Sequence, residues 1–224
     1  MSLANEEPAR KRQKVDYKDT ITVLAGQQKT AYTVHKTVFC TRSPFFQTAT
    51  NGNSWLEAKK QTVSLPETPE EIFEAYIHWA YTSEIDLSAL GKATAAYKHP
   101  DWVIITRLWI LADMLIDEQL CNSLTDLMLI KFEEDYGRPS PATLCAIWEH
   151  TSAESQLRKL CVDIMSCCSW TTIEAQAAKM PHEIFVEFTR RYFEHEQHIK
   201  GRRGLLRHAK CRYHIHRDSE ECGS

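Results

Sequence analysis

The chain has 224 residues, a formal net charge of −3, and 43% hydrophobic and 25% charged residues. These values are ordinary for a globular protein, and the length suffices for one compact domain with an extension or for two small domains. The slightly acidic balance argues against a protein that coats nucleic acid, and no apolar run approaches the roughly 20 residues of a membrane span.

The first residues do not have the pattern of a secretory signal peptide, which predicts an intracellular protein, nuclear or cytoplasmic. Most of the 8 cysteines fall within helical patterns, where they serve as small apolar residues. We therefore expect reduced thiols rather than a framework of disulfides.

Residues 1–16 are polar and are predicted to form a disordered tail with one basic cluster, made of Arg10, Lys11, Arg12 and Lys14. A Lys-Arg-x-Lys pattern in a flexible tail is typical of a nuclear-import signal, because extended basic side chains can reach acidic grooves on a receptor. The alternative is a solvated arm, since short basic runs are common.

The first ordered elements are predicted to be a β-hairpin followed by two short helices. Residues 20–25 and 30–34 are rich in β-branched residues and flank a turn. Helices are expected after His35-Lys36 and at Ser43-Pro44, where serine is the N-cap and proline the first helical residue. Residues 61–65 predict another strand, and Thr68-Pro69 predicts a helix capped by the threonine.

The middle of the chain completes an α+β pattern. Residues 84–87 are expected to form a short edge strand, and residues 88–101 a loop or an insertion. Apolar residues cover most of the circumference of a helix over 102–116, which predicts a central buried element. A second helix restarts at Asp117, so the two helices form a hairpin packed beside the strands.

Residues 135–199 predict an all-α extension. Ser140-Pro141 begins its first helix, and apolar residues recur at helical spacing over 157–168. A last helix is expected after Met180-Pro181. Because these helices are short, we expect the extension to pack onto the preceding domain, and we expect residues 200–224 to form a basic tail.

From residue 17 to about 132, a set of residues in a fixed order resembles the BTB/POZ family. The matching residues are Asp19, His35, Lys36, Arg42, Ser43, Phe45, Phe46, Val63, Leu65, Pro66, Phe73, Tyr76, Tyr81, Leu111, Ala112, Asp113 and Leu120. At the end of the expected helix after Pro69, the tripeptide Trp79-Ala80-Tyr81 is similar to the one in filamentous-fungal members. The chain departs from the family mainly in residues 88–101. The resemblance implies a BTB/POZ fold over 17–134, followed by the all-α extension.

The resemblance also implies protein–protein interaction. In this family the first hairpin and the two following helices commonly form a homodimer face, carried here by His35, Val38, Phe39, Arg42, Phe45 and Phe46. One expected role is a nuclear scaffold or transcriptional co-regulator, which the basic N-terminal cluster favours. The other is an adaptor of a cullin-type ubiquitin ligase, but no separate client-binding domain follows.

Catalytic motifs are not found in the sequence. The 7 glycines form no phosphate-binding loop, and no Gly-x-Ser-x-Gly elbow occurs. His195-Glu196-Gln197-His198 lacks one residue of the His-Glu-x-x-His zinc motif, so it is expected to be a solvated helix end. We therefore expect no enzyme and no cofactor apart from a structural zinc.

The C-terminal tail contains a candidate zinc site made of Cys211, His214, His216 and Cys222. A tight turn can direct Cys211 and His214 at one ion, and His-x-His places both imidazoles on one side of an extended segment. The alternative is a solvated cationic tail. With only Tyr213 available for stacking, this tail is not expected to recognise nucleic acid.

Overall fold

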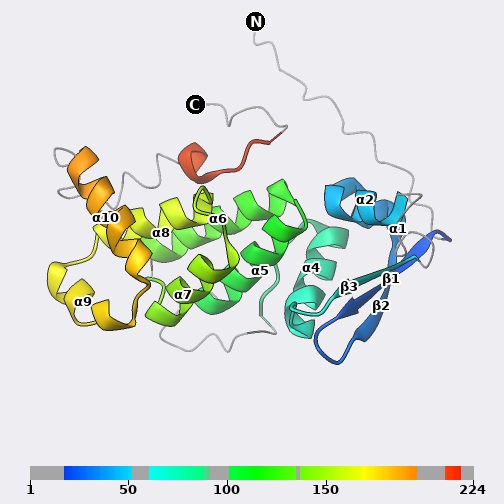
Figure 1. The fold of residues 1–224 in the computed structure, drawn as a ribbon. Helices are drawn as coiled ribbons and strands as arrows, with labels where there is room; N and C mark the ends of the chain where they lie inside the picture. Colours follow the sequence, from blue (N-terminus) through cyan, green and yellow to red (C-terminus); the bar gives the residue numbers. More distant parts are fainter. Residues whose placement is uncertain are drawn as a thin grey trace, which may run out of the picture.

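The computed structural model in Figure 1 describes residues 18–51, 61–88, 90, 101–134, 137–195 and 210–217. A small sheet lies at one end of the molecule, and helices extend from it as an elongated array. The strands are β1 (Thr20–Ala25), β2 (Thr30–His35) and β3 (Thr62–Leu65). The first helices of the chain are α1 (Lys36–Arg42), α2 (Pro44–Asn51), α4 (Glu70–Thr82), α5 (Trp102–Met114) and α6 (Glu118–Glu134), and α4 lies between the sheet and the pair α5 and α6.

The sheet has the order β2-β1-β3. β1 pairs with β2 antiparallel, from Thr20 opposite His35 to Ala25 opposite Thr30, and with β3 in parallel. The turn between β1 and β2 uses Gly26 at φ 73° and Lys29 at φ 57°, both in the left-handed region that glycine adopts without strain. The predicted hairpin and the predicted third strand are thus confirmed.

Ser43 joins α1 to α2. Its backbone N–H donates to the Phe39 carbonyl at 2.9 Å, which ends α1. Its hydroxyl accepts from the backbone N–H of Phe46 at 3.2 Å, which caps α2, and donates to the carbonyl of Leu115. Pro44 is the first residue of α2, as the sequence predicts.

One predicted helix start and one predicted strand are wrong. The carbonyl of Pro69 accepts from Phe73, so Pro69 itself is the N-cap of α4 and Thr68 lies outside the helix. Residues 84–87 form no strand. The Asp86 carboxylate accepts from the backbone and hydroxyl of Ser88, and this local turn replaces pairing with the sheet.

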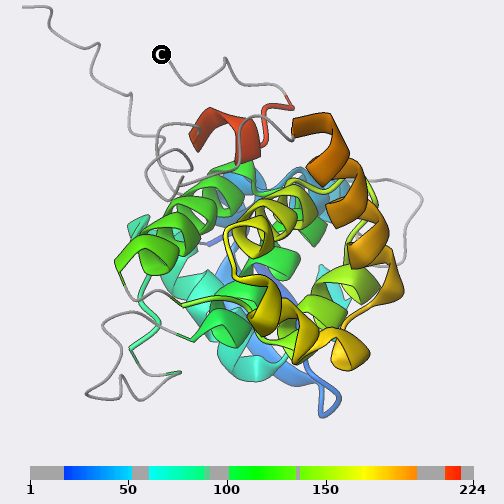
Figure 2. The same cartoon turned by 90° about the vertical axis from the view of Figure 1, so that its left-hand side faces the viewer.

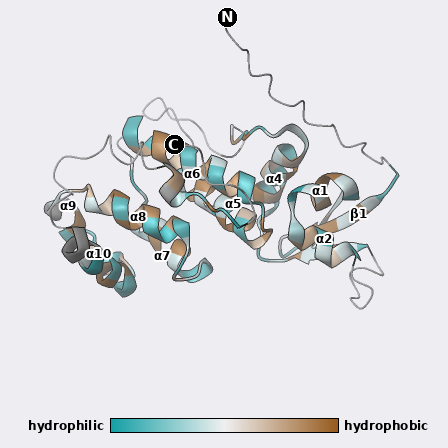
Figure 3. Ribbon diagram, turned by 90° about the horizontal axis from the view of Figure 1, so that it is seen from above, coloured by the Kyte–Doolittle hydropathy of each residue, from teal (hydrophilic) through white to brown (hydrophobic). Residues whose placement is uncertain are grey.

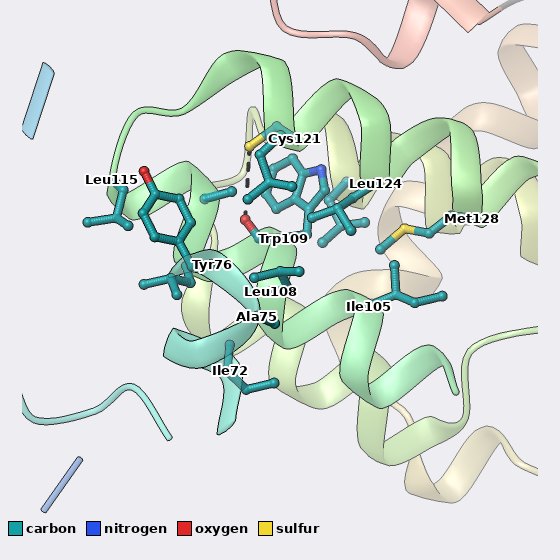
Figure 4. Packing of buried hydrophobic residues seen from close by; sticks show 14 of the residues in the cluster. Ile72, Ala75, Tyr76, Ile105, Leu108, Trp109, Leu115, Cys121, Leu124 and Met128 are labelled. Carbon is teal, nitrogen blue, oxygen red and sulfur yellow. Dashed lines mark hydrogen bonds between the residues drawn. The ribbon is translucent and has the colours of Figure 1, made fainter. Parts of the chain in front are cut away.

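Helices α5 and α6 form the predicted helical hairpin and hold the centre of the core. Figure 4 shows Trp109 of α5 among apolar side chains from α4, α5 and α6. Its indole N–H donates to the Thr125 hydroxyl at 3.2 Å, and the Cys121 thiol lies 3.9 Å from its carbonyl oxygen. These two contacts join α5 to α6 through polar groups in the middle of the hairpin.

Asp117 sits between α5 and α6 and is only 1% exposed. Its carboxylate accepts from the indole of Trp79 at 3.1 Å and the hydroxyl of Tyr76 at 3.3 Å, both in α4. It also accepts from the backbone N–H of Leu120 at 3.0 Å, which caps α6. Burial raises the pKa of this carboxyl, although the hydrogen bonds oppose the shift.

The C-terminal part of the chain is an all-helical extension, as predicted. Its elements are α7 (Pro141–His150), α8 (Gln156–Ser166), α9 (Trp170–Glu174), η1 (Ala177–Lys179), α10 (His182–His195) and η2 (Lys210–Tyr213). Figure 3 shows hydrophobic and hydrophilic bands alternating along α7 and α8, as expected of helices with one buried face. α7 packs on α5 and α10 packs on α8, so the extension continues the array directly (Figure 2).

We predict that Asp117→Asn changes how stability depends on pH. A raised pKa means that the folded state holds the Asp117 proton more tightly than the unfolded state, whose carboxyl titrates near pH ~4. The contribution of Asp117 to stability therefore falls as the pH rises above that value. We expect the free energy of unfolding of the wild type, measured relative to Asp117→Asn by urea titration, to decline between pH 4 and pH 7. A difference that stays constant over this range would contradict the buried, protonatable carboxyl.

Candidate functional site

Two of the predicted interface residues lie inside the domain. Phe39 and Phe46 are both 0% exposed, and their ring centroids are 5.2 Å apart in an edge-to-face arrangement. The ring of Phe39 also contacts that of Tyr76, at 5.7 Å. These two phenylalanines fix α1 and α2 to the core, and within this chain they leave no surface for a partner.

Val38 and Phe45 lie at the outer side of α1 and α2. Both are partly buried and pack against the edge of the core, and the Phe45 ring is 5.5 Å from that of Phe46. Pro44, Gln47 and Thr48, on the same helix as Phe45, are exposed. Of the predicted interface residues, Val38 and Phe45 are therefore the ones that present partly exposed apolar area.

His35 forms the corner between β2 and α1, where the sequence places it. Its Nδ1 is 2.7 Å from the hydroxyl of Tyr81, and its backbone N–H donates to the same oxygen at 3.1 Å. Tyr81 is 45% exposed, which is high for an aromatic side chain. This pair connects the hairpin to the end of α4 and adds an aromatic ring to the nearby surface.

Arg42 points into its own domain. Its Nε donates to the Ala80 carbonyl at 2.9 Å, and its terminal nitrogens donate to Ser83 and, at 3.4 Å, to Gln119. The guanidinium also lies 5.0 Å from the centre of the Trp79 ring. Arg42 therefore has a structural role within the domain, because it binds groups at the C-terminal end of α4.

Besides the contacts of His35, two side-chain hydrogen bonds hold the hairpin to α4. The Tyr32 hydroxyl donates to Glu74 at 3.0 Å and the Thr30 hydroxyl donates to Glu70 at 2.7 Å. Burial, together with the neighbouring Glu74 carboxylate, raises the pKa of Tyr32 to about 12. These bonds therefore fix the β2 strand against α4.

The structure brings together part of the predicted zinc site. The thiol of Cys211 is 3.4 Å from Nε2 of His216, whereas Nε2 of His214 is directed to the Asp126 carboxylate at 3.2 Å. Cys222 lies outside the described residues, as does the predicted import signal of Arg10, Lys11, Arg12 and Lys14. Among the described residues no group of three or more histidine, cysteine or acidic side chains could hold a metal ion. Zinc binding stays a prediction, which atomic emission on protein purified without chelator would test.

A surface that sequence reasoning missed lies along α6. Residues 210–217 are not the solvated tail of the alternative interpretation, because Tyr213 is 1% and His214 is 9% exposed. They dock against α6 and α8, where Figure 1 shows η2 above these helices. Three polar residues of α6 receive them: Glu118, Asn122 and Asp126. Their spacing of four residues was visible in the sequence, but the segment that they bind is about 90 residues away.

Comparison with known proteins identifies the fold. Residues 10–103 match the family model of the BTB/POZ domain, so this part of the chain is a BTB/POZ domain. The match spans the sheet, α1, α2 and α4, and ends at the start of α5. No curated protein matches the chain.

BTB/POZ domains are protein–protein interaction modules, so the chain carries such a module. Within the described part of the chain, none of the helices has both the length and the apolar character needed to cross a bilayer. The family match therefore shows the class of function, which is protein–protein interaction. The surfaces described above indicate where such contacts can form.

We predict that Arg42→Ala destabilises the fold itself. The substitution removes the hydrogen bond to Ala80 and the stacking on Trp79, and we expect a loss of about 2 kcal/mol in the free energy of unfolding. Arg42→Lys should recover only part of this loss, because an ammonium group lacks the planar fork. Chemical denaturation of both variants checks this, and an unchanged Arg42→Ala protein would contradict the internal role.

Proposed function

We propose that the protein is a scaffold or co-regulator that acts through self-association of its BTB/POZ domain and through partner binding. The observation that carries the proposal is the division of α1 and α2 into two sides. Phe39 and Phe46 fix the helices to the core, while their sequence neighbours Val38 and Phe45 keep partly exposed apolar area.

Such an arrangement suits an isologous contact, in which each copy contributes the same patch. Rigid helices hold the apolar side chains in place before association, so little further ordering is needed. Tyr81, hydrogen-bonded to His35, adds exposed aromatic area nearby. Arg42 fixes the end of α1 to the end of α4.

We predict that Phe45→Asp weakens self-association. A charge placed in a dimer contact must be desolvated without a partner, and we expect the dissociation constant to rise about tenfold or more. Sedimentation equilibrium should show the wild type approaching twice the 25.9 kDa of the chain and the variant remaining nearer to it.

Gln47→Asp is the matched control, because Gln47 is exposed on the same helix and the new charge can remain hydrated. This control should associate like the wild type. A wild-type protein that sediments as a single 25.9 kDa species at high concentration would rule out the self-association proposal.

A second candidate function is substrate adaptor of a cullin-type ubiquitin ligase. In favour of it, α7 packs directly on α5, so the extension and the helical hairpin present one continuous helical surface. A cullin could bind across such a surface.

Co-purification from cells separates the two candidates. Chromatin regulators among the recovered proteins would support the co-regulator, and cullin subunits would support the adaptor. For the nuclear role, we predict that a fluorescent fusion loses nuclear accumulation when Lys11, Arg12 and Lys14 are replaced by alanine. A fusion that is equally cytosolic with and without these residues would count against that role.

A further inference from the structure

The segment 210–217 lies along α6 in the way that a bound peptide lies on a receptor. His214 contacts Asp126, Ile215 contacts Asn122, and the backbone N–H of Arg217 donates to Glu118 at 2.9 Å. The segment thus runs antiparallel to the helix. Residues four apart in a helix share one face, so α6 offers a row of regularly spaced acceptors.

Asn122 holds the backbone of the segment rather than a side chain. Its amide nitrogen donates to the Ile215 carbonyl at 3.0 Å, and its carbonyl oxygen accepts from the Ile215 N–H at 2.7 Å. One side chain therefore satisfies both polar groups of one residue. Main-chain contacts of this kind provide affinity for a peptide largely independent of its sequence.

Side-chain anchors on both sides of Ile215 add specificity. Tyr213 is 1% exposed, and its hydroxyl donates to the Asp163 carboxylate of α8 at 2.7 Å. At the other end, the guanidinium of Arg217 contacts Asp113 at 2.7 Å. The receiving carboxylates form an acidic row, which matches the basic composition of the chain from Lys200 onward.

Much of the receiving face is polar, although the Tyr213 ring belongs to the hydrophobic core and Ile215 packs against that core. The Asp126 and Asp113 side chains are 33% and 30% exposed even with the segment in place. Asn122 and Glu118 are also only partly buried. Water can hydrate these polar groups when the segment leaves, so the cost of removing the segment lies in the apolar contacts of Tyr213 and Ile215.

We propose that the face formed by α6 with Asp113 and Asp163 is a peptide-binding site that the chain's own residues 210–217 occupy as a removable ligand. The ligand chemistry is an aromatic residue with a hydroxyl, a backbone amide two positions later and an arginine two positions beyond that. A free peptide of this chemistry competes for the face, and this holds whether or not the domain self-associates.

The test uses the full chain with a site-specific protease sequence inserted after Gly204. After cleavage, we expect the C-terminal fragment to co-elute with the rest of the protein on size exclusion. An excess of a synthetic peptide of residues 208–219, with Cys211→Ser to prevent oxidation, should displace it. A matched peptide with Ile215→Pro lacks the N–H that donates to Asn122, and it should compete about tenfold less well.

Two variants show whether the described contacts hold the fragment. Arg217→Ala changes only the ligand and leaves the helical body intact, so it should speed the loss of the fragment after cleavage. Asn122→Ala should do the same, while Ser123→Ala, the next residue of α6, should behave as the wild type. Circular dichroism before cleavage confirms that each variant is folded.

The proposal is overturned if excess peptide does not displace the fragment short of unfolding, because the segment is then part of the core. It is equally overturned if the wild-type fragment dissociates as fast as that of Asn122→Ala and Arg217→Ala. Neither result depends on the sedimentation of the Phe45→Asp variant, so failure of this inference and failure of the self-association proposal are distinguishable.

Discussion

The arrangement of the helices depends on one buried carboxylate. Asp117 accepts hydrogen bonds from two aromatic residues of α4 and from the first turn of α6, so it sets the position of one helix relative to the other. The guanidinium of Arg42 lies over the ring of Trp79, which is one of these donors. Through this chain of contacts the end of α1, the end of α4 and the start of α6 are held together. A buried polar group of this kind costs desolvation energy, which its hydrogen bonds offset.

Much of the fold followed from local patterns. Alternation in residues 20–25 and 30–34, the Ser43-Pro44 helix start and the apolar circumference of α5 all correspond to elements in the structure. The errors occurred where side chains compete with backbone pairing. Asp86 forms a turn with Ser88 in place of a strand, and the helix after Pro69 starts one residue later than expected. Such outcomes depend on local hydrogen bonds that periodicity does not report.

The candidate sites were less predictable, because they depend on contacts between distant residues. Sequence alone could not separate Phe39 and Phe46, which are internal, from Val38 and Phe45, which keep exposed area, since all four are apolar within two short helices. Nor could it show that Arg42 binds the Ala80 carbonyl, 38 residues away. The composition of the C-terminal segment is basic, and by itself this composition favours a solvated tail. The spacing of the polar residues on α6 is visible in the sequence, but it does not indicate which distant segment they bind.

The position of residues 210–217 has a consequence for the order in which the chain folds. The contact between Arg217 and Asp113 joins residues 104 apart, and that between Tyr213 and Asp163 joins residues 50 apart. During synthesis the partners on α5, α6 and α8 leave the ribosome before the segment exists, and domains begin to fold from the N-terminal side. The acidic face of α6 is therefore exposed on every newly made molecule for a short time. Until residues 210–217 have been made and have docked, other chains can bind to that face.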